Sequence, residues 1–315
     1  MNQHFMKPRP KIIVLCGPTA VGKTSCAIRL SLAVQGEIVN ADSMQIYRYM
    51  DIGTAKPTEI ERQRVRHHLL DIADPDEPFD AAKYAAAAQQ VIQTLNEKDI
   101  VPILTGGTGL YIKALVNGLF EMAPSDPQVR ERLLSTAETI GVDRMYDRLR
   151  EIDPEAASKL HPHDNHRIIR ALEVYEITGK PISLHQKRHG FSDQPYQVLK
   201  IGLMTDRESL YRRIDSRVCA MMEEGFLDEV KKLLAMGYEA GLKSMQSIGY
   251  RHLTDYIQGR MDWEETIRTL KRDTRRYAKR QMTWFGRDGE VLWKTPDEAG
   301  DIIRMAEEFL NSGQG

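Results

Sequence analysis

Residues 17–24 read Gly-Pro-Thr-Ala-Val-Gly-Lys-Thr and match the pattern Gly-x-x-x-x-Gly-Lys-Ser/Thr of a phosphate-binding loop. The apolar run Lys-Ile-Ile-Val-Leu at 11–15 precedes the loop and is typical of a short buried strand. From Thr24 onward, apolar residues such as Ala27 and Leu30 recur at helical spacing. A strand, a glycine-rich turn and a helix bring backbone N–H groups and a helix N-terminus to one point. This segment therefore predicts a site for a diphosphate or triphosphate group.

Each residue type in this loop has a physical role. Gly17 and Gly22 let the backbone approach a ligand where a Cβ atom would intrude. Lys23 is placed to reach the outer phosphate oxygens, and the Thr24 hydroxyl is placed to contact Mg²⁺, which we expect as the cofactor. The residues expected to bind the phosphates are Gly17, Pro18, Thr19, Ala20, Val21, Gly22, Lys23 and Thr24.

Further short apolar runs alternate with helical stretches along the chain. The strand candidates are residues 37–40, 69–72, 100–104 and 197–204, and residues 80–95 form one of the intervening helices. Strands that alternate with helices indicate a parallel sheet covered on both faces. We therefore expect an α/β fold with a phosphate-loop-type parallel sheet as its core.

The pattern changes near Gly118. Residues 125–180 show only helix signals and contain no strand candidate, after which strand character resumes. The simplest arrangement is an all-helical insertion domain at residues 120–190. The catalytic α/β core is then formed by residues 1–119 and 191–315.

Composition limits the classes of partner and site. The 315-residue chain can bury a large core, and its formal charge of −1 means that a nucleic-acid partner needs a local basic patch. Cys16, Cys26 and Cys219 have no Cys-x-x-Cys spacing, which argues against a zinc site and a disulfide framework. The N-terminal residues lack an apolar core, and no run of about 18 apolar residues occurs. We expect a soluble, cytoplasmic protein without a membrane partner.

Residues 37–47 read Glu-Ile-Val-Asn-Ala-Asp-Ser-Met-Gln-Ile-Tyr, a strand that runs into a polar turn. The carboxyl ends of parallel strands open at one edge of a sheet, where ligands bind. Asp42 should therefore lie near the phosphates, as a Mg²⁺ partner, a general base, or a residue that caps a turn or helix. Position alone favours the capping role. The loop at 51–57 follows, and it is too rich in specific residues to be a simple linker.

Seven blocks of sequence together carry a family resemblance. They are Gly-Pro-Thr-Ala-Val-Gly-Lys-Thr (17–24), Asn-Ala-Asp-Ser-Met-Gln-Ile-Tyr-Arg-Tyr-Met-Asp-Ile-Gly-Thr-Ala-Lys-Pro (40–57), His-His-Leu-Leu-Asp (67–71), Gly-Gly-Thr-Gly-Leu-Tyr (106–111), Arg-Ala-Leu-Glu-Val-Tyr (170–175), Ser-Ile-Gly-Tyr-Arg (247–251) and Lys-Arg-Gln-Met-Thr-Trp-Phe (279–285). Over about residues 10–290 the chain resembles the tRNA dimethylallyltransferases, or tRNA isopentenyltransferases. It resembles the bacterial form, since it lacks the C-terminal zinc finger that eukaryotic relatives often carry.

The resemblance implies transfer of the dimethylallyl group of dimethylallyl diphosphate to N6 of an adenine at tRNA position 37, beside the anticodon. Diphosphate is then a leaving group, and the phosphate loop stabilises the negative charge that develops on it. Asp42 matches the family's base by position, and Lys23 would neutralise the diphosphate. Thr19 resembles a substrate contact near the diphosphate. Arg217 resembles a basic residue that closes on the diphosphate, with a solvated helix arginine as the alternative.

The same resemblance implies contacts with the anticodon stem-loop of a tRNA whose adenine must be extruded into a pocket. Thr108 resembles a residue at the tRNA entrance, whereas its position alone fits a turn hydroxyl equally well. We expect the chain to act as a monomer. The residues implied as tRNA contacts are Asp42, Ser43, Met44, Gln45, Thr108, Arg130, His166, Arg167, Ile168, Ile169, Arg170, Ser247, Ile248, Gly249, Tyr250 and Arg251.

A basic stretch supplies a second reason to expect RNA. Residues 268–288 contain eight lysines and arginines and two acids, and several of the basic residues recur at three- or four-residue spacing. Tyr277 and Trp284 lie among them and could stack on bases or pack inward. A solvated helix face is the alternative. Because the whole chain is nearly neutral, we favour RNA contact, through Arg275, Lys279 and Arg280.

Residues 161–166 read His-Pro-His-Asp-Asn-His, which invites a metal interpretation. The histidines, however, do not have the i, i+4 spacing of a helical zinc site. We therefore favour an RNA contact at the start of the helix that follows.

Two other classes of function compete with prenyl transfer. One is a nucleotide or small-metabolite kinase in which the helical insertion is a lid, but no clear second acidic strand motif accompanies Asp42. The other is a non-catalytic RNA-binding NTPase, which would need a base-specifying motif such as Asn/Thr-Lys-x-Asp, and none is present.

Overall fold

The computed structural model describes residues 9–118, 126–189 and 195–312. The chain divides into two compact units, which are described separately here. One consists of Met1–Val116 with Pro195–Gly315, and the other of Asn117–Gln194. The domain limits expected from the sequence, at residues 119–120 and 190–191, lie outside the described residues.

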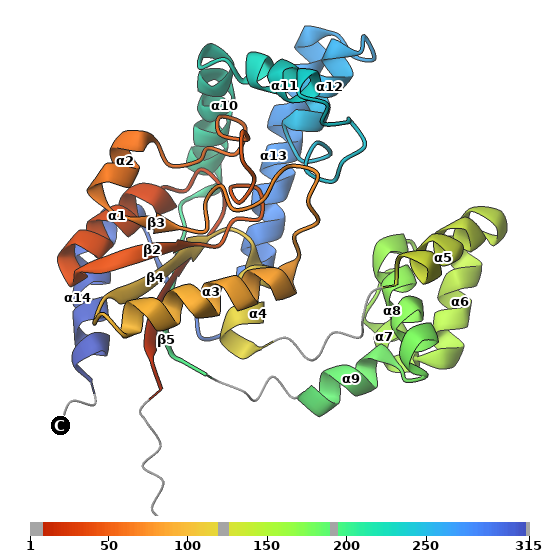
Figure 1. Ribbon diagram of the computed structural model, residues 1–315, viewed down its shortest axis with the longest axis horizontal. Helices are drawn as coiled ribbons and strands as arrows, with labels where there is room; N and C mark the ends of the chain where they lie inside the picture. The colour runs from red at the N-terminus through yellow and green to blue at the C-terminus, as the bar shows by residue number, and fades with distance from the viewer. Residues whose placement is uncertain (1–8, 119–125, 190–194, 313–315) are drawn as a thin grey trace, which may run out of the picture. The chain divides into compact units, whose positions relative to one another are not determined.

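The first unit is built on a sheet of six strands in the order β3-β2-β4-β1-β5-β6, in which every neighbouring pair is parallel (Figure 1). This confirms the expected α/β class with a parallel core. The strands are β1 (Lys11–Cys16), β2 (Gly36–Asn40), β3 (His67–His68), β4 (Val101–Gly106), β5 (Gln197–Leu203) and β6 (Leu292–Lys294).

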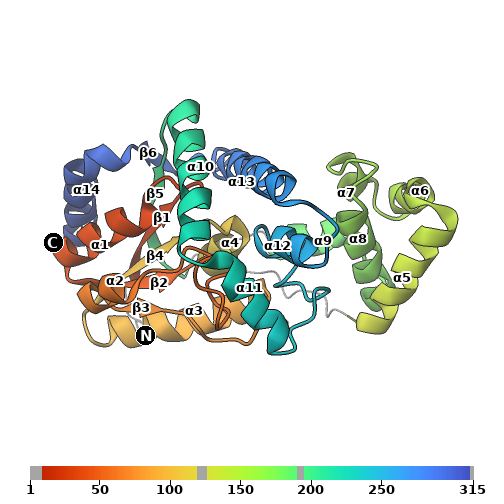
Figure 2. The ribbon, with the colours of Figure 1, turned by 90° about the horizontal axis from the view of Figure 1, so that it is seen from above.

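Apolar side chains cover both faces of this sheet. Successive residues of a strand point to opposite faces. Ile13, Leu15 and Ile38 belong to a core cluster shared with α1 (Lys23–Val34) and α14 (Ala299–Asn311), two helices that pack against each other (Figure 2). Ile12 and Val14, which point the other way, are also 0% exposed. The sheet is therefore buried on both sides, as β-branched residues at successive positions predict.

Further helices of this unit cover the sheet and its carboxyl edge. α10 packs along α13, and α12 lies between α11 and α13 (Figures 1 and 2). Among the described residues, no helix is both long and apolar enough to cross a membrane. These helices are α2 (Glu59–Arg64), α3 (Ala81–Asn96), α4 (Gly109–Asn117), α10 (Arg207–Glu223), α11 (Phe226–Ala235), α12 (Tyr250–Ile257) and α13 (Trp263–Phe285).

Two strand predictions are corrected by the structure. The strand expected at 69–72 is wrong: β3 ends at His68, and Leu69 and Asp71 adopt φ angles of 60° and 56°, which an extended strand does not allow. The sequence analysis also missed β6, because a three-residue strand at the edge of the sheet carries no periodic signal.

The second unit contains only helices among its described residues, as expected. Its core consists mainly of Leu133, Met145, Leu149, Ile168 and Leu172 from three of the helices. The helices are α5 (Pro127–Ile140), α6 (Val142–Ile152), α7 (Pro154–Ser158), α8 (Asn165–Thr178) and α9 (Ile182–His189).

The turns after β2 and β4 touch closely enough to give a stability prediction. A Cβ atom on Gly106 would lie 2.2 Å from the carbonyl carbon and oxygen of Ala41. Gly106→Ala should therefore lower the free energy of unfolding by about 1–3 kcal/mol, the usual cost of overpacking. Urea denaturation measures the change. Gly241→Ala is the control, because its Cβ would have nothing within 4 Å. Equal stability of the two variants would contradict this packing.

Candidate active site

The phosphate loop joins β1 to α1 and is held in a conformation that its glycines permit. Gly17 has a φ of 143°, and a Cβ there would lie 2.6 Å from the carbonyl oxygen of Leu203 in β5. Gly22 has a φ of 105° and is the N-cap of α1. Both positions favour glycine, because L side chains rarely adopt these φ angles. The N-terminus of α1 therefore opens onto the cavity beside the loop, as expected of an anion site.

Lys23 curls back over the loop. Its Nζ donates hydrogen bonds to the carbonyl oxygens of Gly17 (3.0 Å) and Pro18 (2.7 Å). The pKa of Lys23 is lowered to about 8, chiefly by burial; the carboxylate of Asp42 opposes this shift, and the positive charge of Arg217 adds to it. A group whose charged form is this poorly solvated gains from an incoming anion.

Asp42 follows β2 and has a capping contact and an open oxygen at the same time. Its Oδ1 accepts the backbone N–H of Met44 at 2.9 Å, so the sequence expectation of a turn-capping aspartate is met locally. Asn40 fixes the turn, because its Oδ1 accepts the N–H of Asp42 and its Nδ2 donates to the Leu69 carbonyl. Asp42 Oδ2 makes no hydrogen bond with the described residues and is available to a substrate.

Thr108 ties the turn after β4 to the turn after β2. Its Oγ1 accepts the N–H of Ser43 at 3.0 Å and lies 3.2 Å from Ser43 Oγ. Its own N–H donates to the carbonyl oxygen of Ala41. The turn-hydroxyl role considered for Thr108 is thus present in the structure.

Gln281 is a site residue that lies in the block 279–285 but that the sequence does not single out. From α13, its Oε1 accepts the N–H of Thr19 at 2.8 Å and its Nε2 donates to the carbonyl oxygen of Gly107 at 2.9 Å. The side chain is buried, and a Cβ on Gly107 would lie 2.1 Å from its Nε2. One amide therefore joins the phosphate loop, the turn after β4 and α13. The only signal for this bond in the sequence is that glycine-rich turns occur together with a glutamine in an expected helix.

Two cavities open at this edge of the sheet. The polar cavity has a volume of about 240 Å³ and is lined by Thr19, Ala20, Gly22, Lys23, Thr24, Ser25, Ile38, Asn40, Asp42, Gln45, Thr54, Ala55, Pro57, Glu61, His67, Thr105, Gly106, Arg217 and Gln281. The apolar cavity has a volume of about 320 Å³ and is lined by Thr19, Asp42, Ser43, Met44, Gly53, Thr54, Ala55, Ile214, Arg217, Val218, Met221, Phe226, Gln246, Ser247, Ile248, Gly249, Tyr250, Leu270, Thr274, Tyr277 and Arg280.

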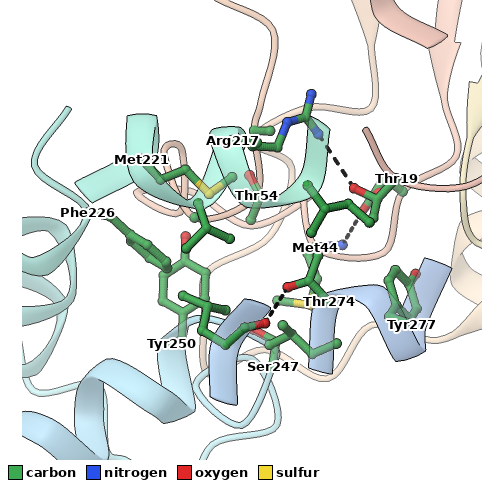
Figure 3. Close-up of a pocket in the computed structure, with 18 of the residues that line it drawn as sticks. Thr19, Met44, Thr54, Arg217, Met221, Phe226, Ser247, Tyr250, Thr274 and Tyr277 are labelled. Carbon is green, nitrogen blue, oxygen red and sulfur yellow. Dashed lines mark hydrogen bonds between the residues drawn. The ribbon is translucent and has the colours of Figure 1, made fainter. Parts of the chain in front are cut away.

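The two cavities share Thr19, Asp42, Thr54, Ala55 and Arg217, so these residues lie where the cavities meet. Arg217 reaches from α10 to place Nη1 3.5 Å from Thr19 Oγ1 (Figure 3). Burial lowers the pKa of Arg217, and the nearby Asp42 carboxylate opposes that shift. The four residues expected to be catalytic from the sequence, Asp42, Thr19, Lys23 and Arg217, are thus brought together.

Residues Ser247–Arg251 differ in whether they line the apolar cavity. Ser247, Ile248, Gly249 and Tyr250 line it, and Tyr250 is 0% exposed. The Tyr250 hydroxyl donates to Glu229 at 2.7 Å, and burial together with that carboxylate raises its pKa well above the usual value. Arg251 instead pairs with Asp273 at 2.6 Å.

The basic face of α13 is partly neutralised. Arg275 forms a bidentate ion pair with Asp215 of α10, and Arg268 pairs with Glu265. Lys279 and Arg280, in contrast, are exposed and form no ion pair with the described residues. Arg280 lies over the Tyr277 ring at 5.5 Å and lines the apolar cavity. The free positive charge is therefore concentrated at the C-terminal half of α13, beside the cavity.

In the helical unit, the residues expected to contact RNA differ in how exposed they are. Arg130 Nη2 lies 3.0 Å from His166 Nε2, which joins α5 to the start of α8. Arg167 is exposed, but Ile168 and Ile169 are buried in the core of the unit. A side-chain contact between tRNA and either isoleucine is incompatible with that burial. Arg170 donates to the buried Glu173 at 2.7 Å.

No cluster of three or more potential metal ligands among His, Cys, Asp and Glu occurs in the described part of the chain. Thr24 and Asp42 line the same polar cavity, so a hydroxyl and a carboxylate oxygen face one space. Mg²⁺ commonly keeps several waters and binds through one or two protein oxygens plus substrate phosphates. The donor set therefore fits Mg²⁺ brought in with a diphosphate.

Comparisons with known proteins show which family the chain belongs to. The chain matches the family model described as IPP transferase over residues 45–288. It is 53% identical over 298 residues to a protein named tRNA dimethylallyltransferase from Syntrophobacter fumaroxidans, which covers 94% of this chain and 87% of the relative. A protein of the same name from Desulfosudis oleivorans is 51% identical over 307 residues, covering 97% and 98%.

Solved structures show the same similarity. The full-length tRNA isopentenylpyrophosphate transferase from Bacillus halodurans has a TM-score of 0.72 at 40% identity, covering 96% of this chain and 97% of that one. A eukaryotic dimethylallyltransferase described as acting on tRNA has a TM-score of 0.79 at 28% identity, covering 96% and 79%. On the family match, the sequence identities and the shared fold, the chain belongs to the IPP transferase family.

Proposed function

We propose that this chain is a tRNA dimethylallyltransferase that transfers the dimethylallyl group of dimethylallyl diphosphate to N6 of adenine 37. The observation that carries the proposal is the meeting of a phosphate-loop cavity with an apolar cavity at Asp42, Thr19 and Arg217. A donor with an anionic head and a hydrocarbon tail needs both environments. The names of the relatives support the same reaction.

The reaction follows from what these residues can do. The allylic C–O bond breaks as the C1–N6 bond forms, and diphosphate leaves with the bonding electron pair. Lys23 and Arg217 stabilise the charge that develops on the leaving oxygen. Asp42 Oδ2 accepts the proton lost from N6, while Oδ1 stays bonded to the Met44 N–H and fixes the carboxylate. The weak nucleophile suffices, because an allylic carbon tolerates cationic character.

Mg²⁺ is proposed as the cofactor, held by Thr24 and, through water, by Asp42. When bound with diphosphate, the ion would neutralise part of the charge on the leaving group. Thr24 is the second residue of α1, whose N-terminus faces the polar cavity, so the hydroxyl is positioned by the helix itself.

The proposed RNA substrate is the anticodon stem-loop, and the protein is proposed to act in the cytoplasm as a monomer. The adenine would have to leave the base stack to reach Asp42. The exposed Arg280 lines the apolar cavity, and the exposed Lys279 precedes it on α13; these two cations suit the phosphates on either side of an extruded nucleotide.

A kinase is the less favoured function. It would use the same phosphate loop to hold ATP, but it gives no role to an apolar cavity that shares Asp42 with the phosphate site. The family match and the relatives' names also favour prenyl transfer.

Asp42→Asn tests the base. The amide can still accept the Met44 N–H but takes up no proton, so kcat for label transfer from dimethylallyl diphosphate to tRNA should fall about 100- to 10,000-fold. The dissociation constant for tRNA should stay within about twofold, because tRNA binding rests mainly on phosphate contacts elsewhere. Asp42→Ala, which removes the turn contact as well, is the comparison. Undiminished kcat in Asp42→Asn would remove Asp42 as the base.

The pKa of Lys23, lowered to about 8, predicts how anion binding depends on pH. Below this pH the ammonium is charged and attracts inorganic pyrophosphate; above it the proton is lost in the free protein. Affinity measured by calorimetry should therefore weaken by up to about tenfold per pH unit above pH 8. Lys23→Met controls for ionisation of pyrophosphate itself and should bind weakly with a flatter profile. Identical pH profiles for the two proteins would contradict this role.

Salt dependence distinguishes the paired from the unpaired arginines and lysines of α13. Replacing Lys279 with Ala should weaken tRNA binding and reduce the slope of log affinity against log salt concentration by about 1. Arg275→Ala should change the slope less, because Asp215 already neutralises that guanidinium. Filter binding over a range of salt concentrations measures both. An unchanged slope in Lys279→Ala would assign this face to solvent.

A further inference from the structure

The loop at 51–56, called the wall loop below, contributes Gly53, Thr54 and Ala55 to the apolar cavity. Thr54 and Ala55 also line the polar cavity, so the wall loop lies where the two cavities meet. Its conformation thus sets the shape of the space in which the head and the tail of a donor join. The contacts that fix the loop therefore affect how a donor is placed for the reaction.

One carboxylate, that of Glu229 in α11, binds three successive backbone N–H groups of the wall loop. Glu229 Oε2 accepts from Asp51 (2.9 Å) and Ile52 (2.7 Å), and Oε1 accepts from Gly53 (3.1 Å). Oε1 also accepts the Tyr250 hydroxyl at 2.7 Å. Four donors converge on one anion from a segment 176 to 178 residues away in sequence and from α12. Hydrogen bonds to a charged acceptor are the stronger kind.

Packing against two aromatic rings adds to this contact. A Cβ on Gly53 would lie 2.2 Å from Phe226 Cε2 and 2.7 Å from Tyr250 Cε2, so the loop backbone rests directly on these two rings. The rings meet edge to face at 4.9 Å, and both line the apolar cavity. Figure 3 places Phe226 and Tyr250 at the opposite side of that cavity from Thr19 and Arg217.

The remaining bonds of the loop show that residues other than Glu229 also hold it. Gln45 Nε2 donates to the carbonyl oxygens of Thr54 and Ala55, both at 3.1 Å. Lys56 is buried and donates to Asp51 Oδ1, Asp71 Oδ1 and the Tyr47 carbonyl oxygen. Loss of the Glu229 contacts would therefore loosen residues 51–53, while Gln45 and Lys56 still hold the loop.

We propose that Glu229 is a positioning residue for the prenyl donor, which holds the wall loop against the Phe226–Tyr250 pair and thereby shapes the tail pocket. Glu229 touches neither cavity itself. The proposal rests on the proposed function, since it assumes that the apolar cavity receives the dimethylallyl group. The diphosphate head depends on the phosphate loop, which Glu229 does not contact.

The test compares Glu229→Gln with wild type in three measurements. The amide keeps the size of the side chain but loses the charge and one acceptor, so residues 51–53 should loosen. KM for dimethylallyl diphosphate should rise about tenfold and kcat should fall, since small displacements of a reacting group are costly. The inhibition constant of inorganic pyrophosphate should change by less than about twofold, because the head site is intact. If Glu229 only stabilised the fold, Glu229→Gln would lower thermal stability without changing KM for dimethylallyl diphosphate more than the inhibition constant of pyrophosphate.

Two further variants keep the test decisive. Asp228→Asn, at the neighbouring exposed position of α11, removes a carboxylate that, among the described residues, pairs only with Lys231 and should leave every constant unchanged. Glu229→Asp retains the charge and should give a smaller rise in KM, so it decides the question if Glu229→Gln does not fold. An unchanged KM, or an equal loss of donor and pyrophosphate affinity, would overturn the proposal. Absence of prenyl transfer by the wild-type protein would instead count against the proposed function.

Discussion

The parallel pairing of β1 and β2 on either side of β4 is the constraint on which the site depends. Because all three strands end at the same edge, the turns that carry Thr19, Asp42 and Thr108 must meet there. Side chains then lock the turns: Thr108 bonds to Ser43, and Gln281 bonds to both the phosphate loop and the turn after β4. The Asp42 carboxylate thus lies beside the phosphate site because the sheet, Thr108 and Gln281 together fix its position.

The phosphate loop alone does not determine which reaction is catalysed. Its glycines and the N-terminus of α1 form an anion site that serves a phosphoryl donor and a diphosphate leaving group equally well. The apolar cavity makes the difference, because it opens from the same residues and is lined by Met44, Met221 and Phe226. Two adjoining environments of opposite polarity favour a substrate with an anionic head and a hydrocarbon tail.

The sequence sufficed for features coded locally. The phosphate loop, the parallel sheet and Asp42 follow from contiguous motifs and from periodicity. It did not predict Gln281 or Glu229, whose partners lie 262 and 176 to 178 residues away and are chosen only by tertiary packing. Nor did the charge run on α13 reveal, for the same reason, that Asp215, 60 residues earlier, pairs with Arg275. The strand expected at 69–72 failed because apolar composition does not reveal positive φ angles.

The central claim is that diphosphate is the leaving group. The most direct measurement is the stoichiometry of diphosphate release against modification of unmodified tRNA, with the nucleosides identified by mass spectrometry. The account predicts one diphosphate released for each five-carbon group found on N6 of adenine, and none released without tRNA. Phosphate transfer from ATP with no prenylated adenine, or diphosphate release that is independent of tRNA, would contradict it.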